Sequence, residues 1–409
     1  MGDFYQNGLV TTLHNLRTQP IDQLEEKVYY FSRKRPIALV IPSLFSELNG
    51  PALPKILDEL SHVSYLNEVI IGLDAANREE FQYAKKYFSR LHQHHRILWN
   101  DGPRLKKLHK LLERKNIAPS ELGKGRNAWY CFGYLIASGK SEAIALHDAD
   151  ILTYERGLLA RLIYPVVDPV FNYKFCKGYY YRADDNKLNG RAARLLVTPL
   201  LRSLKKLFGP DNYLDYLDSF RYPLAGEFSM RADVVKTIRI PNDWGLEIGI
   251  LSEVHRNNAT NRICQVDIID RYDHKHQPVS FDDPEKGLHK MSIDIAKTIY
   301  QKLASNGKIF SLDTFHSLKA TYFRIAQDFV EQYNSDAIIN GLVLDRHTEE
   351  KAVDLFAKSI YNAGEMFLQN PNQDSFIPSW KRIISAIPEF PSLFYKAVED
   401  DNQILKSDF

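Results

Sequence analysis

The stretch "ALHDADILTY" (residues 145–154) ends an apolar run with two carboxylates placed one residue apart. The run that leads to the first of them, "AIALHD" (143–148), has the length and composition of a buried strand. Asp148 and Asp150 then form either a solvated turn or a site for a divalent cation. Mg²⁺ commonly takes one or two carboxylates and completes its shell with substrate phosphates and water. The stretch therefore predicts a strand that ends in chemistry-bearing residues, as in an α/β sheet.

The region upstream repeats this pattern. Three short apolar runs predict further buried strands: "IALVIP" (37–42), "EVIIGL" (68–73) and "RILW" (96–99). Between them, "GPALPKILDELSHV" and "REEFQYAKKYFSRLHQ" carry apolar residues at helical spacing. Alternation of strands and helices predicts an α/β fold with a mostly parallel sheet flanked by helices.

Polar residues follow the ends of three of these predicted strands. They are Pro42-Ser43-Leu44, Asp74 and Asp148-Ala149-Asp150. Ligands of open α/β sheets bind at the carboxyl ends of the strands. We therefore expect these three groups of residues to lie together at one edge of the sheet, although strand ends also carry polar residues for purely structural reasons.

Three parts of the chain differ in pattern. Residues 1–35 predict a helical lead-in, 36–281 the α/β domain, and 282–409 a helical C-terminal extension. The extension carries two apolar stripes at helical spacing: Met291, Ile295, Ile299, Leu303 and Leu318, Tyr322, Ile325, Phe329. These stripes suit a homodimer contact or a cover over a site.

Composition excludes several classes of protein. The 409 residues are 44% hydrophobic and 25% charged, with a net charge of +2, so no global field favours nucleic acid or an anionic membrane. No apolar run approaches the roughly 20 residues that span a bilayer, and the first residues do not resemble a signal peptide. Three scattered cysteines without metal spacing favour a reducing compartment. We expect a cytoplasmic protein.

Four further residues could serve a site near the two aspartates. In "GKGRN" (123–127), Lys124 would provide a point charge for a diphosphate, unless the stretch is a plain turn before a helix near Ala128. Glu227 and Glu247 lie in apolar frames, where a carboxylate needs a partner or caps a helix. His274 or His276 could complete a metal shell begun by Asp150, or belong to a solvated loop.

Taken in order, these motifs resemble those of retaining GT-A glycosyltransferases. The series is a strand ending in Pro, an Asp after the second strand, Gly-Lys-Gly, Asp-x-Asp, "PLAGE", "GLEIG" and a late His. It is similar in particular to the glucosyl-3-phosphoglycerate synthase family (GT81), which includes related mannosyl enzymes. The resemblance covers about residues 37–280 and implies a GT-A, Rossmann-like mixed sheet.

The resemblance also implies roles for residues on the donor side. Asp150 and His274, with His276 as the alternative, would ligate Mg²⁺ or Mn²⁺, and Glu247 and Asp148 would lie at the sugar-transfer centre. Eight donor-side positions, Asp148 again among them, would bind the nucleotide sugar, and "PSLFSE" matches the family's Pro-Ala-Leu-Asn-Glu-Glu only in part. These positions are Pro42, Leu44, Glu47, Asp74, Lys124, Asp148, Ala149 and Glu227.

The acceptor region departs more from the family pattern. The family grips the phosphate of 3-phosphoglycerate with Gly-Arg-x-Thr, whereas this chain has "NGRAARLLVTPLL" (189–201). Gly190 and Arg191 are kept, and Ala193 replaces the hydroxyl. Arg194 would compensate as a second cation, because arginine suits phosphate and carboxylate recognition.

The resemblance implies transfer of a hexose, with glucose favoured, from a UDP- or GDP-sugar to the 2-hydroxyl of 3-phosphoglycerate or glycerate. Such products are compatible solutes. Mannosyl transfer or another small acceptor is the nearest alternative. A sugar-1-phosphate nucleotidyltransferase is another, but "PSLFSELNGP" is not the glycine-rich basic loop expected after its first strand. A non-catalytic sugar-nucleotide-binding protein is a third.

Overall fold

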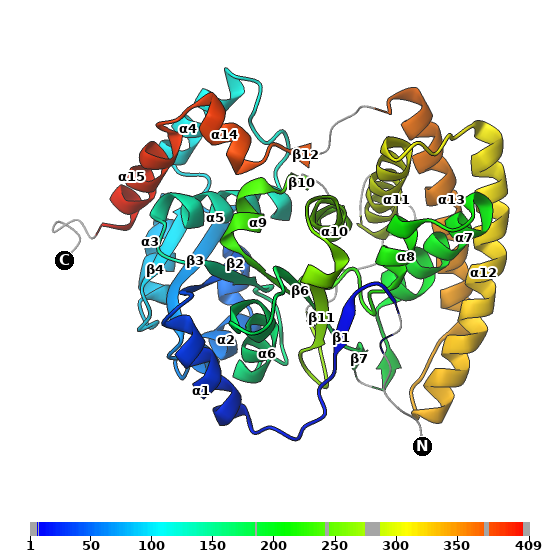
Figure 1. The fold of residues 1–409 in the computed structure, drawn as a ribbon, viewed down its shortest axis with the longest axis horizontal. Helices are drawn as coiled ribbons and strands as arrows, with labels where there is room; N and C mark the ends of the chain where they lie inside the picture. Colours follow the sequence, from blue (N-terminus) through cyan, green and yellow to red (C-terminus); the bar gives the residue numbers. More distant parts are fainter. Residues whose placement is uncertain are drawn as a thin grey trace.

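The computed structural model describes residues 6, 8–184, 186–241, 245–274, 287–371 and 376–403. Its centre is an eight-stranded sheet with the order β1-β11-β6-β9-β5-β2-β3-β4 (Figure 1). The strands are β1 (Thr11–Leu13), β2 (Ile37–Leu44), β3 (Leu66–Asp74), β4 (His95–Trp99), β5 (Ala143–Leu146), β6 (Phe175–Tyr179), β9 (Phe228–Arg231) and β11 (Ile263–Asp267).

All neighbouring strands in this sheet run parallel except where β9 is involved. β9 pairs antiparallel with both β5 and β6, and the other pairs are parallel. The mostly parallel mixed sheet and its four predicted strands are therefore confirmed. One detail of the prediction is wrong: Pro42 to Leu44 and Asp74 do not follow their strands but belong to them. Pro42 to Leu44 pair in register with residues 72–74 of β3, so Asp74 is the last residue of that strand.

Each face of the sheet is covered by helices, and this explains the apolar runs. Along β2, Ala38 and Val40 pack into one hydrophobic core, and Ile37, Leu39 and Ile41 pack into the other. A strand buried on both faces loses the polar alternation of a half-exposed strand. The second core lies under α1 (Ile21–Ser32), α2 (Ala52–Leu60), α3 (Arg78–Phe88) and α6 (Arg156–Val167).

The first core lies under the remaining helices of the α/β region. They are α4 (Pro103–Glu113), α5 (Lys124–Ser138), the π-helical segment Ala192–Val197, α7 (Thr198–Phe208), α8 (Asn212–Asp218), α9 (Ala232–Thr237) and α10 (Leu246–Asn257). Two short 3-10 helices complete this region, at Phe45–Asn49 and Thr260–Arg262.

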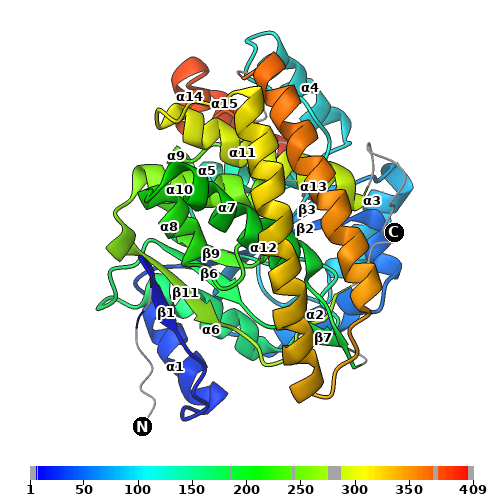
Figure 2. The ribbon, with the colours of Figure 1, turned by 90° about the vertical axis from the view of Figure 1, so that its right-hand side faces the viewer.

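The C-terminal helices form two groups. α11 (Gly287–Ser305), α12 (Leu312–Ile339) and α13 (Arg346–Gln369) make a layer beside α7 (Figures 1 and 2). α14 (Trp380–Ala386) and α15 (Phe390–Asn402) return to the far side of the molecule and pack against α9, α4 and α5. The apolar stripes predicted on α11 and α12 face the core, where Ile299 and Tyr322 are fully buried.

The first residues of the chain form a strand as well as the predicted helix. α1 is present, and β1 also joins the edge of the sheet by pairing with β11. β7 (Ala183–Asp184) and β8 (Lys187–Leu188) form a small antiparallel hairpin. β10 (Ile240–Pro241) and β12 (Phe376–Ile377), far apart in the chain, form a second antiparallel pair. The boundary proposed at 281/282 lies outside the described residues.

Candidate active site

The reversed direction of β9 brings its first residue to the edge where the parallel strands end. Phe228, the first residue of β9, pairs with Leu146, the last residue of β5. The "AGE" stretch before β9 and the "HDAD" stretch after β5 therefore lie together. Gly226 shows how closely: a Cβ atom on it would lie 2.5 Å from Asp148 Oδ2. Glycine is required there because any side chain would displace the carboxylate.

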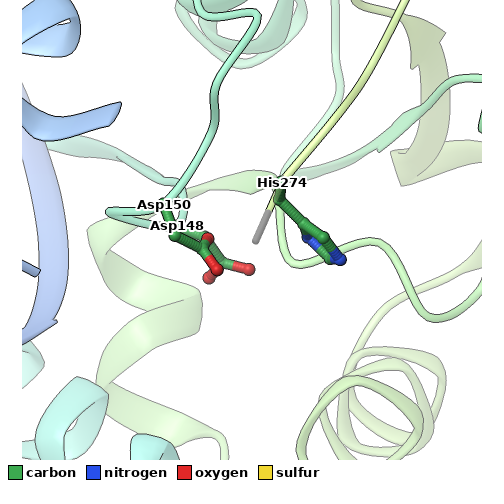
Figure 3. Close-up of side chains that lie close together, drawn as sticks. All are labelled: Asp148, Asp150 and His274. Atoms are coloured by element: carbon green, nitrogen blue, oxygen red, sulfur yellow. The ribbon is translucent and has the colours of Figure 1, made fainter. Parts of the chain in front are cut away.

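Asp148, Asp150 and His274 form one cluster at this edge. Each offers a ligand atom, and these atoms lie within 4.8 Å of one another. Figure 3 shows the two carboxylates side by side, with the imidazole entering from a separate segment. That segment is held by a bridge between Ile151 and His274 and by a 2.9 Å hydrogen bond from Leu152 N to Asp273 O.

The charges of the cluster suit a divalent cation. Burial, followed by the nearby charge of Asp148, raises the pKa of Asp150 to about 7. Glu47, in the 3-10 helix after β2, adds to the same negative potential. Crowded carboxylates with an imidazole are hard oxygen and nitrogen donors that match Mg²⁺ or Mn²⁺. The donor set therefore fits the expected metal, and it includes Asp148 as well as Asp150.

Lys124 lies at the amino end of α5 and pairs with two of the predicted residues. Its Nζ is 2.6 Å from Asp148 Oδ1 and 3.2 Å from Glu247 Oε1. Burial opposes the charged amine, but Asp148 and Glu247 outweigh it and raise the pKa of Lys124. Lys124 also lowers the pKa of Asp148 against the effect of burial. Lys124, Asp148 and Glu247 thus form an ion triad, with Glu247 in the first turn of α10.

Glu227 is fully buried behind this triad. Its two oxygens accept hydrogen bonds from Tyr180 Oη at 2.7 Å and Tyr272 Oη at 2.6 Å. The two tyrosine rings stack with centroids 3.7 Å apart. Burial and the charge of Asp148 raise the pKa of Glu227. Glu227 precedes a strand and caps no helix, and its position ties Tyr272 to the site two residues before His274.

The other predicted donor-side residues lie along the same edge. Asp74 ends β3, and its Oδ1 accepts from Asn100 Nδ2 at 2.8 Å and lies 3.3 Å from an Arg126 terminal nitrogen. Burial raises the pKa of Asp74. Leu44 is 49% exposed at the end of β2, whereas Ala149 is buried between the aspartates.

The predicted acceptor segment lies at the start of the π-helical segment. Gly190 has φ +76°, a backbone conformation that favours glycine. Arg191 Nε is 2.8 Å from Glu349 Oε1, and an Arg194 terminal nitrogen is 2.9 Å from Glu349 Oε2. Glu349 belongs to α13, so the C-terminal helices reach this segment directly. His276, the alternative metal ligand, lies outside the described residues.

The sequence reasoning missed several residues of this site. They are Lys177, Tyr180, Tyr272, Asn100, Arg126 and Glu349. Two of them carried a signal: Arg126 stands inside the quoted "GKGRN", and Lys177 interrupts the apolar strand β6. Burial lowers the pKa of Lys177 to about 8, and its Nζ donates to Ala225 O.

A GT-A-like sheet with an Asp-x-Asp, a histidine and a lysine at its carboxyl edge defines a metal-dependent, nucleotide-sugar-using glycosyltransferase. The curated relatives identify the family. Over 402 residues, the chain is 43% identical to the glucosyl-3-phosphoglycerate synthase of Persephonella marina, covering 98% of this chain and 99% of the relative. It is 41% identical over 399 residues to that of Methanococcoides burtonii, covering 97% of each. The chain belongs to the glucosyl-3-phosphoglycerate synthase family.

Solved structures agree on the fold. Glucosyl-3-phosphoglycerate synthase from Mycobacterium tuberculosis, in complex with Mn²⁺, UDP-glucose and phosphoglyceric acid, gives a TM-score of 0.52 at 18% identity, covering 74% of this chain and 89% of that chain. Mannosyl-3-phosphoglycerate synthase from Rubrobacter xylanophilus gives 0.53 at 19% identity, covering 74% and 83%. No family model matches the chain. Among the described residues, no helix has the length and apolar composition to cross a membrane.

Proposed function

We propose that this protein transfers glucose from a nucleotide diphosphate glucose, UDP-glucose in the first instance, to the 2-hydroxyl of 3-phosphoglycerate. Retention of the anomeric configuration is part of the proposal, as the family resemblance implies. The relatives at 41–43% identity are named for glucosyl transfer to this acceptor. The observation that carries the proposal is the cluster of Asp148, Asp150 and His274 beside the Lys124–Asp148–Glu247 triad.

Asp150, His274 and Asp148 would hold a divalent cation. When bound, Mg²⁺ or Mn²⁺ would supply Lewis-acid stabilisation of the charge that develops on the leaving diphosphate. One structure of the Mycobacterium tuberculosis relative contains Mn²⁺ together with UDP-glucose and phosphoglyceric acid, and another structure of the same protein contains Mg²⁺ and UDP. The Asp150 carboxyl must lose its proton to act as a ligand.

Lys124 would meet part of the same charge without help from a metal. It is protonated at neutral pH because two carboxylates raise its pKa, and its partly exposed side chain can contact a diphosphate oxygen. Its ion pairs with Asp148 and Glu247 fix its position before the substrate arrives. Preorganised charge of this kind needs no rearrangement during the reaction.

The nucleotide of the donor and the phosphate of the acceptor would bind on opposite sides of the triad. Asp74, held by Asn100 and Arg126, would accept hydrogen bonds from the nucleotide base. Glu247 would lie beside the sugar because it shares Lys124 with Asp148. Arg191 would bind the acceptor phosphate, since arginine forms paired hydrogen bonds with phosphate oxygens.

The direct test measures release of nucleoside diphosphate from UDP- and GDP-glucose and from GDP-mannose, with Mg²⁺ or Mn²⁺. Each donor is assayed with 3-phosphoglycerate, with glycerate and with no acceptor. We expect release that depends on UDP-glucose and 3-phosphoglycerate, and NMR of the product to show an α-glucosyl linkage. Absence of acceptor-dependent release from every donor would refute the proposed function.

We further propose that the protein acts in the cytoplasm as a homodimer. The three cysteines are free thiols buried in the structure, which suits a reducing compartment. Exposed apolar side chains at the end of α12, Ile338 at 68% and Ile339 at 84%, support a contact between copies. Light scattering after size-exclusion chromatography measures the mass in solution, and a monomer at micromolar concentration contradicts the dimer.

A further inference from the structure

Glu349 is a buried carboxylate that joins the C-terminal helices to the predicted acceptor segment. It lies in the first turn of α13 and is 2% exposed. One oxygen pairs with Arg191 and the other with Arg194, at 2.8 Å and 2.9 Å. Arg191 is 158 residues away along the chain, so only the tertiary fold brings the residues together.

The two arginines bound by Glu349 differ in their surroundings. Arg194 has a side chain that is 9% exposed, stacks on Tyr333 of α12 at 4.8 Å, and donates to the carbonyls of Asn189 at 2.8 Å and Leu188 at 3.3 Å. These contacts fix it within the protein. Arg191 is 25% exposed, and its contacts to described residues use only Nε. Arg191 is therefore the arginine that can offer its terminal nitrogens to a ligand.

We propose that Glu349 is a positioning residue for acceptor recognition, which holds Arg191 ready for the acceptor phosphate and uses Arg194 as its anchor. This inference rests on the proposed function, because it takes Arg191 as the phosphate-binding arginine. We call the three residues the Glu349 clamp. The clamp also gives α13 a part in acceptor binding.

The physical reason for a clamp is that two guanidinium groups close together repel each other. A single carboxylate between them offsets this repulsion and leaves the group with one net positive charge for an anionic acceptor. Its fixed geometry also spares the acceptor the entropy of ordering a long side chain. The chain lacks the family's hydroxyl, since Ala193 stands there. Orientation of Arg191 therefore has to come from elsewhere, and Glu349 supplies it.

The experiment is steady-state kinetics of the full-length Glu349→Gln variant, with 3-phosphoglycerate and UDP-glucose varied separately. The amide keeps the volume of the carboxylate but carries no charge, so both ion pairs are lost. Its oxygen can still accept from one arginine, while its NH₂ group faces the other, which can only donate. We expect the KM for 3-phosphoglycerate to rise on the order of tenfold or more. The KM for UDP-glucose should stay within about twofold.

Glu253→Gln is the matched control. Glu253 is also buried, at 4% exposed, and also pairs with two arginines, Arg239 at 3.1 Å and Arg256 at 3.5 Å, but on α10 away from the acceptor segment. It should leave the ratio of the two KM values unchanged. Glu349→Asp keeps the charge with a shorter reach, and we expect an intermediate KM. Thermal melts show whether each variant is folded, and calorimetric titration with 3-phosphoglycerate measures binding without turnover.

The outcomes separate the clamp from the proposed function. A selective rise in the acceptor KM and in the dissociation constant for 3-phosphoglycerate supports the clamp. An unchanged acceptor KM, or an equal rise for both substrates, overturns it. A lower acceptor KM also overturns it, because Glu349 would then compete with the acceptor for Arg191. Wild-type protein that fails to transfer glucose to 3-phosphoglycerate refutes the function itself.

Discussion

Lys124 Nζ lies 2.6 Å from Asp148 Oδ1, and this ion pair joins the start of α5 to the end of β5. Because Glu247 shares the same ammonium group at 3.2 Å, three elements meet at one charge. The arrangement places a fixed cation beside two carboxylates that the family resemblance assigns to donor binding and sugar transfer. It is the part of the site whose removal has the clearest expected effect.

Replacing Lys124 with Met removes that cation while keeping a side chain of similar length. We expect kcat to fall on the order of 10²–10³-fold, since the charge on the leaving diphosphate loses a preorganised partner. Steady-state kinetics with UDP-glucose measures the change. Lys174→Met, which breaks the surface pair with Asp233, serves as the control. Full activity of the Lys124 variant contradicts the role given to this residue.

Asp150→Asn removes a carboxylate from the metal cluster. We expect weaker Mn²⁺ binding and a loss of activity on the order of 10²–10³-fold, which excess Mn²⁺ restores only in part. Titration of the protein with Mn²⁺, followed by electron paramagnetic resonance, measures binding directly. Asp233→Asn at the surface should bind Mn²⁺ as the wild type does. Unaltered Mn²⁺ affinity in the Asp150 variant would show that the cluster is not the metal site.

Gly226→Ala tests the close approach between the "AGE" stretch and Asp148. The added Cβ would lie 2.5 Å from Asp148 Oδ2, so the carboxylate must move. Displacement of a reacting group by about 1 Å can cost on the order of 10²-fold in rate. Gly157→Ala is the comparison, because its Cβ would approach the flexible end of Ile21 at 3.2 Å and make an ordinary contact with Glu155 Oε1 at 3.6 Å. Equal activities of the two variants contradict the prediction.

Tyr272→Phe and Tyr180→Phe each remove one hydrogen bond from Glu227. Only Tyr272 lies next to the His274 segment. We therefore expect Tyr272→Phe to weaken Mn²⁺ binding by about tenfold, as is usual when a residue that orients a metal ligand is lost. Tyr180→Phe should have a much smaller effect. Calorimetric titration with Mn²⁺ distinguishes the two variants. Equal losses of Mn²⁺ affinity would show that Glu227 stabilises the surrounding core and does not position His274 in particular.

Lys177 makes the stability of the fold depend on pH. Burial lowers its pKa to about 8 from 10.5. Between these values the unfolded chain binds more protons at this residue than the folded protein does, so this contribution to stability increases as the pH rises. We expect Lys177→Met to lose that increase, which amounts to about 1.4 kcal/mol per pH unit at most.

Urea unfolding of wild type and Lys177→Met at about pH 7.5 and about pH 9 measures this difference. Buried tyrosines and cysteines also respond to alkaline pH, but both proteins share them and their effect cancels. Lys174→Met, at a partly exposed lysine, should respond to pH as the wild type does. The same pH response in all three proteins would contradict the low pKa of Lys177.

Strand ends and motif order could be read from the sequence because they depend on local pattern. Asp148 and Asp150 directly follow a short apolar run, and parallel strands share a carboxyl edge. The partners of Arg191 and Glu227 could not be predicted in this way. Glu349 lies on α13, whose recognisable sequence pattern is a set of apolar residues at helical spacing. A charged residue in such a helix is usually expected on the face exposed to solvent. The tyrosines that bind Glu227 are common core residues, and nothing local marks their hydroxyl groups.

The antiparallel direction of β9 could not be predicted from the sequence either. "FSMR" (228–231) has no feature that tells a parallel strand from an antiparallel one, because direction is set by the connections around it. The same holds for β1, whose three residues become a strand only by pairing with β11. Proline lacks a backbone N–H and is uncommon inside a central strand, so the sequence indicates a strand that ends at Pro42, with Leu44 beyond it. Their pairing with β3 continues nonetheless.

α15, at the C-terminal end of the chain, packs against elements that are synthesised early, and this affects how the protein folds during translation. Glu399 pairs with Arg96 of β4 at 2.8 Å and accepts from Tyr134 of α5 at 2.6 Å, while Asp401 pairs with Arg104 at 2.5 Å. During translation, Arg96, Arg104 and Tyr134 leave the ribosome 265 to 303 residues before their partners on α15. The part of the molecule formed by β4, α4 and α5 is therefore expected to remain incompletely covered until α15 has been made.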